Sequence, residues 1–198
     1  PHPTTATPST YRRHEQTAEF GRLLVNSGAG ALSRAAAWCA EMGAQSGKIW
    51  TNKKLGPVAG TTDDELYESE RTATNANPTH FGYSLAVPDG EYLLRLHCAE
   101  IFFGAPGGVA GGPGKRVFDV TVEGQLALDD YDLWADVGPA TAVVHDLPVV
   151  VADGALDMSF DSSVNRPKLS GYELLPLERA GSYCPAAPNS VGPGADLA

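Results

Sequence analysis

Short apolar runs separated by turn residues fill the chain from about residue 80 onward, and they constrain the fold more than any other feature. In Tyr92–Cys98, apolar residues alternate with Arg95 and His97, as expected of a strand with one buried face. Similar runs occupy residues 80–87, 116–124, 140–151, 155–163 and 168–178. Pro-Asp-Gly at 88–90 and Ala-Asp-Gly at 152–154 provide turns between runs. This spacing, without a strand–helix–strand rhythm, predicts an all-β fold, an antiparallel β-sandwich.

The two ends of the chain differ in composition from its middle. Residues 1–21 open with PHPTTATPST, which has too few apolar side chains for a core and predicts a linker or stalk. Residues 180–198 lose hydrophobic periodicity and gain proline and glycine, which predicts a linker toward a further module. The sandwich domain is therefore expected at 22–179, with neighbouring modules or subunits reached through the terminal segments.

The first part of this domain has weaker signals. Arg22–Asn26 is the first strand candidate, and Ala31–Met42 has helical composition. The alternative for the second segment is an irregular loop that crosses the domain and contains Trp38 and Glu41. Little regular structure is expected between residues 47 and 67, because glycines and a proline divide that stretch into short pieces.

The charge balance and the cysteines exclude several classes of function. The 24 acidic and 14 basic residues give a net charge of -10, which argues against nucleic acid and anionic membrane surfaces and leaves neutral or cationic ligands open. No apolar run is long enough for membrane insertion. The three cysteines lack metal-ligand spacing, so no zinc or other cofactor is expected. Cys39 and Cys98 could form a disulfide or remain two free thiols, and Cys184 lies in the polar tail.

Several blocks of sequence, in a fixed order, resemble one family. The blocks are LLVNSGAG (23–30), AGTTDDELYESERT (59–72), YLLRLHCAEIFF (92–103), KRVFDVTVEGQ (115–125), DGALDMSF (153–160) and SVNRPKLSGYELL (163–175). Together they are similar to the malectin and malectin-like domains. The resemblance implies a jelly-roll (galactose-binding-like) sandwich that binds short glucose-containing oligosaccharides or glycans in a cleft of loops at one end, without catalysis. It also implies an extracellular, secreted or cell-surface protein.

The resemblance assigns aromatic platforms to this cleft. The family's paired aromatics after Ala-Glu fall on Phe102 and Phe103, and a loop aromatic falls on Trp50, with Trp38 as the alternative alignment. Sugars present apolar C–H faces that stack on such rings, and an indole N–H can also donate to a hydroxyl. Phe102, Phe103 and Trp50 are therefore the predicted stacking residues.

Two further ligand positions of the family have changed in this chain. Thr72 stands where the family has a tyrosine, which removes one ring from the cleft. Asn165 stands where the family has an acidic residue, which keeps a hydrogen-bond acceptor and adds donors but loses the charge. Both are expected to orient sugar hydroxyls, and both changes put the identity of the sugar in question.

Three alternatives accompany this interpretation. Glu100 could form a catalytic pair with Asp119 or Asp161 for glycoside hydrolysis, but we expect Glu100 to bind loop backbone or Arg116. A calcium site is conceivable at Asp129, Asp130, Asp132 and Asp136, although their spacing matches no defined calcium loop. The third alternative is a structural or assembly module, a spacer or protein–protein contact whose sugar site has decayed.

Overall fold

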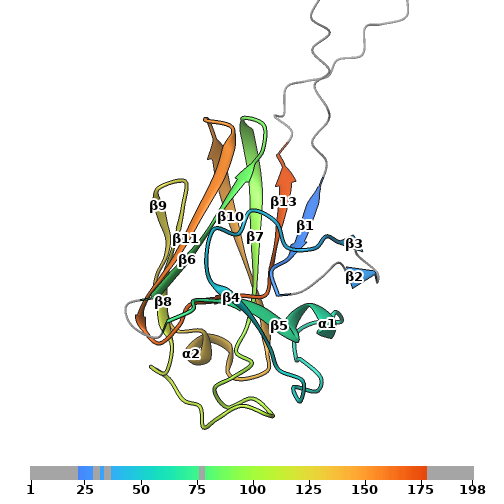
Figure 1. Ribbon diagram of the computed structural model, residues 1–198, viewed down its shortest axis with the longest axis vertical. Coiled ribbons are helices and arrows are strands. Elements are labelled where there is room, and N and C mark those ends of the chain that lie inside the picture. Colours follow the sequence, from blue (N-terminus) through green and yellow to red (C-terminus); the bar gives the residue numbers. More distant parts are fainter. Residues whose placement is uncertain (1–21, 29–31, 34–36, 76–78, 178–198) are drawn as a thin grey trace, which may run out of the picture.

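The computed structural model describes residues 22–28, 32–33, 37–75 and 79–177, and strands dominate it (Figure 1). The strands are β1 (Leu23–Asn26), β2 (Leu32–Ser33), β3 (Ala37–Trp38), β4 (Lys48–Thr51), β5 (Ser69–Thr72), β6 (Thr79–Ala86), β7 (Gly90–Ala99), β8 (Val117–Val122), β9 (Gln125–Tyr131), β10 (Ala142–Val151), β11 (Ala155–Val164), β12 (Lys168–Leu169) and β13 (Gly171–Pro176). The helices are α1 (Asp64–Tyr67) and α2 (Leu133–Val137). Within the described ranges, no helix has the length and apolar character needed to cross a bilayer.

Two four-stranded antiparallel sheets form the body of the domain. Their strand orders are β1-β13-β7-β10 and β6-β11-β8-β9. Tyr92, Leu94 and Leu96 of β7 join one apolar cluster with residues of the second sheet. In that cluster Phe81 and Phe160 stack with ring centroids 4.6 Å apart. The predicted all-β antiparallel sandwich is confirmed, and the period-two pattern of β7 is the reason its apolar side chains share one face.

The predicted turn residues connect the predicted strands. Residues 88–90 lead from β6 to β7 and residues 152–154 from β10 to β11. The Gly154 N–H donates to Asp89 Oδ1 at 2.8 Å, so the two turns are tied together. Between β8 and β9, Glu123 and Gly124 have φ values of 49° and 70°, the left-handed pair required by a tight two-residue hairpin.

The second face of β7 carries a buried polar pair. His97 Nε2 lies 2.9 Å from Glu173 Oε1 of the neighbouring β13, and His97 Nδ1 lies 2.9 Å from the Tyr67 hydroxyl. Burial lowers the pKa of His97, although Glu173 acts in the opposite direction. His97 is therefore a buried cross-strand partner of Glu173.

The predicted helix at Ala31–Met42 is wrong wherever this segment is described. β2 pairs with β3, and Cys39 forms a parallel bridge with Val25. The rest follows the alternative of a crossing loop, because the Met42 carbonyl accepts from the Tyr172 hydroxyl at 3.1 Å. The Trp38 indole N–H donates to Asp63 Oδ2 at 2.9 Å. These tertiary contacts outweigh the helical propensity of the local sequence.

The expectation of little regular structure between residues 47 and 67 missed β4 and α1. β4 belongs to a third, smaller sheet of order β12-β5-β4 that lies across one end of the sandwich (Figure 1).

Cys39 and Cys98 are free thiols, so of the two alternatives for this pair the structure has two free thiols and no disulfide. Cys184 lies outside the described residues.

The first and last strands of the domain are direct neighbours. β1 pairs with β13 so that Leu23 faces Leu174 and Asn26 faces Gly171. The outer ends of these two strands point away from the third sheet (Figure 1).

Candidate functional site

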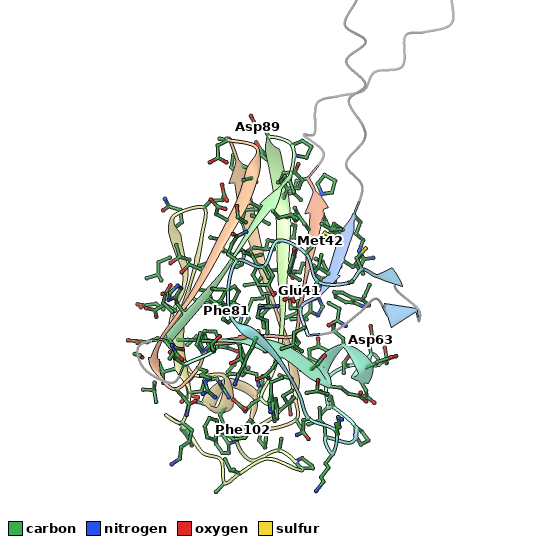
Figure 2. The ribbon with its side chains drawn as sticks, viewed as in Figure 1. Glu41, Met42, Asp63, Phe81, Asp89 and Phe102 are labelled. Carbon is green, nitrogen blue, oxygen red and sulfur yellow. The ribbon has the colours of Figure 1, made fainter. Side chains whose placement is uncertain are left out.

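A pocket opens at the end of the domain formed by the third sheet. β4 and β5 contribute to its wall, and the remaining lining comes from the segments that follow β7, precede β8 and follow β11. The lining residues are Lys48, Trp50, Glu70, Thr72, Phe102, Arg116, Asn165 and Arg166. The empty space, including the part open to solvent, is about 360 Å³, at the small end of the range for ligand sites. Figure 2 shows Phe102 at this end and Asp89 at the opposite end.

Two aromatic rings form a corner in this pocket. The Trp50 and Phe102 rings meet edge to face, with centroids 5.5 Å apart and an interplanar angle of 89°. Both side chains are only partly buried. Because the rings are perpendicular, a flat ligand that stacks on one ring meets the edge of the other.

Phe102 is held at the pocket by its own backbone. Glu100 Oε1 accepts from the Phe102 and Phe103 N–H groups at 2.9 and 3.0 Å. The Phe102 carbonyl accepts from the Val109 N–H at 2.9 Å. A Cβ at Gly108 would lie 1.8 Å from the Phe102 oxygen, so only glycine permits the glycine-rich loop to close here. The glycine-rich loop, residues 104–114, is thereby fixed beside Phe102.

Phe103 lies on the protein side of Phe102, and its side chain does not line the pocket. It is 7% exposed, and its ring meets that of Phe102 at 5.0 Å and 77°. The Arg116 guanidinium lies over the Phe103 ring, 5.2 Å from its centroid. This geometry makes Phe103 a support for Phe102 and Arg116, whereas the sequence predicted a direct ligand contact.

Thr72 and Asn165 line the pocket from two different segments. The Thr72 hydroxyl donates to the Pro167 carbonyl at 2.9 Å, so its hydrogen is used and only its oxygen can accept from a ligand. Asn165 has φ 60°, a left-handed conformation that asparagine tolerates well. Its Oδ1 accepts from the Arg166 N–H at 3.0 Å. Among the described residues its amide NH₂ has no partner, so it can donate to a ligand hydroxyl.

Four charged side chains form an ion network at the base of the pocket, called here its floor: Glu70 and Arg116 line the pocket, and Glu100 and Lys168 lie buried beneath it. Lys168 is fully buried and lies between Glu70 and Glu100, with its Nζ 3.5 Å from Glu100 Oε1 and in contact with Glu70 Oε2. Arg116 Nε donates to Glu100 Oε2 at 2.7 Å. Arg116 also donates to the Arg166 carbonyl. The expected partners of Glu100, loop backbone and Arg116, are thus confirmed.

The two carboxylates of this floor differ in acidity. Burial alone would raise the pKa of Glu100, but the charges of Lys168 and Arg116, with hydrogen bonds from Arg116 and the Phe103 N–H, lower it to about 2. For Glu70, burial dominates and raises the pKa, although Lys168 and Arg116 act in the opposite direction. Both acids are committed to ion pairs within the protein.

The sequence analysis singled out Trp50, Thr72, Phe102 and Asn165, and these four converge on one pocket. It did not single out Lys48, Glu70 or Arg166 as site residues, and it gave Arg116 only a structural role. The sequence did contain a pattern that could have identified Lys48 and Glu70. Lys48 and Glu70 stand two positions before Trp50 and Thr72, and alternate residues of paired strands share a face.

The metal alternative finds no support in the described residues. They contain no group of three or more His, Cys, Asp or Glu side chains that could hold a metal ion. Asp132 instead caps α2 by accepting from the Trp134 and Ala135 N–H groups. Asp136 accepts from the Tyr131 hydroxyl at 2.8 Å.

Comparison with known proteins identifies the family. The sequence profile of the malectin domain matches residues 26–172. The chain belongs to the malectin domain family. Malectin-A of Xenopus laevis is 33% identical over 109 residues, which are 54% of this chain and 36% of that protein. Malectin of Mus musculus is 31% identical over 118 residues, 59% of this chain and 37% of that protein. The alignments of this malectin domain therefore span little more than a third of these relatives.

Solved structures share the fold of this malectin domain at low sequence identity. The Bacteroides uniformis β-glucuronidase superposes with a TM-score of 0.64 and 18% identity, over 79% of this chain and 18% of that chain. The structure of the plant peptide RALF23 in complex with FER and LLG2 gives a TM-score of 0.63 and 18% identity, over 80% and 49% of the two chains. The ANXUR1 extracellular domain of Arabidopsis thaliana gives 0.62 and 14%, over 77% and 47%.

Proposed function

We propose that this malectin domain is a non-catalytic carbohydrate-binding module that recognises short gluco-oligosaccharides or glycans in the pocket between β4, β5 and Phe102. One observation carries the proposal. Trp50, Thr72, Phe102 and Asn165 come from four separate segments, were expected to contact sugar from the family resemblance, and line the same pocket.

The chemistry of the pocket supports this function. The Trp50–Phe102 corner offers an apolar face for the C–H face of one pyranose ring. The Asn165 amide and the Thr72 oxygen can take up hydroxyl groups at the rim of that ring. The site is small and partly open to water, so a single site should bind in the micromolar to millimolar range.

The acids of the site support a binding role over a hydrolytic one. Glycoside hydrolysis requires two carboxyl groups that are free to exchange protons or attack the sugar. Glu70 is bound to Lys168, and Glu100 is bound to Arg116 and to two backbone N–H groups. The family resemblance and the similarity of the fold to plant receptor extracellular domains further support an extracellular location.

Isothermal titration of the whole chain with glucose disaccharides of different linkage tests the proposal. Phe102→Ala and Trp50→Ala should each weaken binding about tenfold, equivalent to about 1.4 kcal/mol. Leu126→Ala, an exposed apolar side chain of β9 away from the pocket, is the matched control and should bind as the wild type does. Absence of binding to every saccharide, or equal binding by all four proteins, would overturn the proposal.

A structural or assembly module is the second candidate, and one surface favours it. An open apolar groove runs between the edge strands β9 and β10, where Leu126 and Val150 are exposed. The solved relative with FER is described as a complex with the peptide RALF23 and LLG2, so a similar fold takes part in protein contacts. A chain that binds no sugar but self-associates, and that becomes monomeric on Val150→Asp, would favour this candidate.

A further inference from the structure

The pocket has a charge opposite to that of the whole chain. The chain carries -10, yet its pocket is lined by the cations Lys48, Arg116 and Arg166 and by one acid, Glu70. Beyond about 10 Å, charges at ordinary ionic strength are largely screened. The charge that a bound ligand experiences is therefore set by these neighbours and not by the remainder of the surface.

The buried part of this charge cancels. Arg116 and Lys168 are matched by Glu100 and Glu70 in the ion network of the floor. Two positive charges remain, on Lys48 and Arg166.

The two remaining cations have no carboxylate partner among the described residues. Lys48 is exposed on β4. Arg166 donates from Nε to the Asn75 carbonyl at 3.1 Å, a neutral acceptor that leaves its charge uncompensated. A carbonyl holds the guanidinium in place without neutralising it, as a binding site for an oxyanion requires.

Lys48 and Arg166 reach the pocket from two different segments, β4 and the segment between β11 and β12. β5 is the central strand of the third sheet, and Thr72 of β5 faces Lys48 on one side and Lys168 on the other. Arg166 lies two residues before Lys168, so the uncompensated cations stand on opposite sides of β5. A ligand at the corner therefore shares the pocket with both cations and with the donor amide of Asn165.

We infer that the pocket prefers an anionic saccharide, one whose pyranose ring carries a carboxylate or a sulfate ester, over the corresponding neutral sugar. This inference deepens the proposed function and rests on it, because it concerns the same site. The Trp50–Phe102 corner would bind the pyranose ring by stacking against one aromatic face and contact with the edge of the other, and Lys48 or Arg166 would bind its oxyanion.

Titration with matched ligands tests the inference. The ligands are cellobiose, the same disaccharide with C6 of its non-reducing ring oxidised to a carboxylate, and the same disaccharide with a 6-sulfate on that ring. In 20 mM salt we expect at least one anionic form to bind about tenfold more tightly than cellobiose, which is ~1.4 kcal/mol. In 500 mM salt this preference should fall to less than threefold, because rim charges are screened. Whichever of the two anionic ligands binds more tightly shows whether the pocket prefers a carboxylate or a sulfate ester.

Variants locate the preference in the pocket. Lys48→Gln and Arg166→Gln should each reduce the ratio of anionic-sugar affinity to cellobiose affinity about threefold, and the double variant should bring this ratio to about one, with both affinities measured on the same variant. Lys53→Gln, which removes an exposed lysine just after β4 and outside the pocket lining, is the control and should retain the full preference.

Equal affinity for neutral and anionic sugars, or a preference that survives the double variant, would overturn the inference and leave the proposed function intact. A complete absence of saccharide binding would overturn both.

Discussion

Two regions of the molecule contain fully buried side chains of different kinds. Apolar side chains fill the interior between the two large sheets, and charged side chains form the floor of the pocket. Phe81, Phe160 and Leu156 are fully buried in the sandwich, and Lys168 and Glu100 are fully buried beneath the pocket. Apolar burial is non-directional, so it depends mainly on shape and volume. A buried ion depends on its specific partners, because an unmatched charge is very costly in a dry site. The two regions should therefore respond differently to the same kind of substitution.

The largest difference is expected when methionine replaces one residue of each region. Lys168→Met leaves Glu70 and Glu100 without their shared cation and should reduce the free energy of unfolding by about 3–5 kcal/mol. Leu156→Met keeps volume and apolar character and should cost less than about 1.5 kcal/mol. Urea denaturation of both variants measures the two values. Similar values would show that the ions of the floor are not an interdependent network.

Phe102 and Phe103 should also differ in how much each contributes to stability. Phe103→Ala removes a buried ring that supports Arg116 and should reduce stability by about 3–5 kcal/mol. Phe102→Ala removes a partly exposed ring and should cost less than half as much. Thermal or urea unfolding measures the two losses of stability. Titration of Phe102→Ala with saccharide then measures the loss of binding. Equal losses of stability would contradict the separation into a supporting ring and a contact ring.

Acid should weaken the floor before it affects the apolar core. The pKa of Glu100 is lowered from 4.5 to about 2 by its cationic partners, against the effect of burial. Its contribution is therefore complete above pH 4.5 and is lost as the pH falls from 4.5 through about 2, a change of about 3 kcal/mol. Unfolding free energies of wild type and Glu100→Gln between pH 7 and pH 2 test this. The variant should be less stable at pH 7 and have a flatter acid limb, and parallel curves would contradict the assignment.

The smallest effect is expected where one hydrogen bond joins β5 to the segment before β12. Thr72→Val removes the donor to the Pro167 carbonyl and should cost about 1 kcal/mol. Thr51→Val, at an exposed position of β4, is the control and should change stability by less than about 0.5 kcal/mol. A loss at Thr51 as large as that at Thr72 would show that the hydrogen bond is not the cause.

The sandwich could be predicted from sequence because its signals are local. The alternation in Tyr92–Cys98 and the turns at 88–90 and 152–154 depend only on neighbours in the chain. The segment Ala31–Met42 could not be predicted in this way, because Trp38 and Met42 are held by contacts with Asp63 and Tyr172, far away in sequence. The short strand β4 was missed for the same reason.

The site could be predicted only in part. Trp50, Thr72, Phe102 and Asn165 came from a family resemblance and meet in one pocket, and Phe103 came from the same resemblance and is buried behind it. The cations of the pocket could not be found from composition, because a net charge of -10 conceals a local excess of positive charge. The sum of charges on a chain describes its surface as a whole, whereas a ligand meets only the groups within a few ångströms.

The adjacency of β1 and β13 has a mechanical consequence. Because Leu23 faces Leu174 and the strands are antiparallel, a pull between residues 22 and 177 loads the ladder at its open end. Its hydrogen bonds would break one after another, as a zipper opens, and not all together as in shear. The strands β4 and β5, which contribute to the pocket wall, lie away from the outer ends of β1 and β13 and outside the line of force (Figure 1). Tension on the flanking segments would peel away β1 while the Trp50–Phe102 corner keeps its geometry.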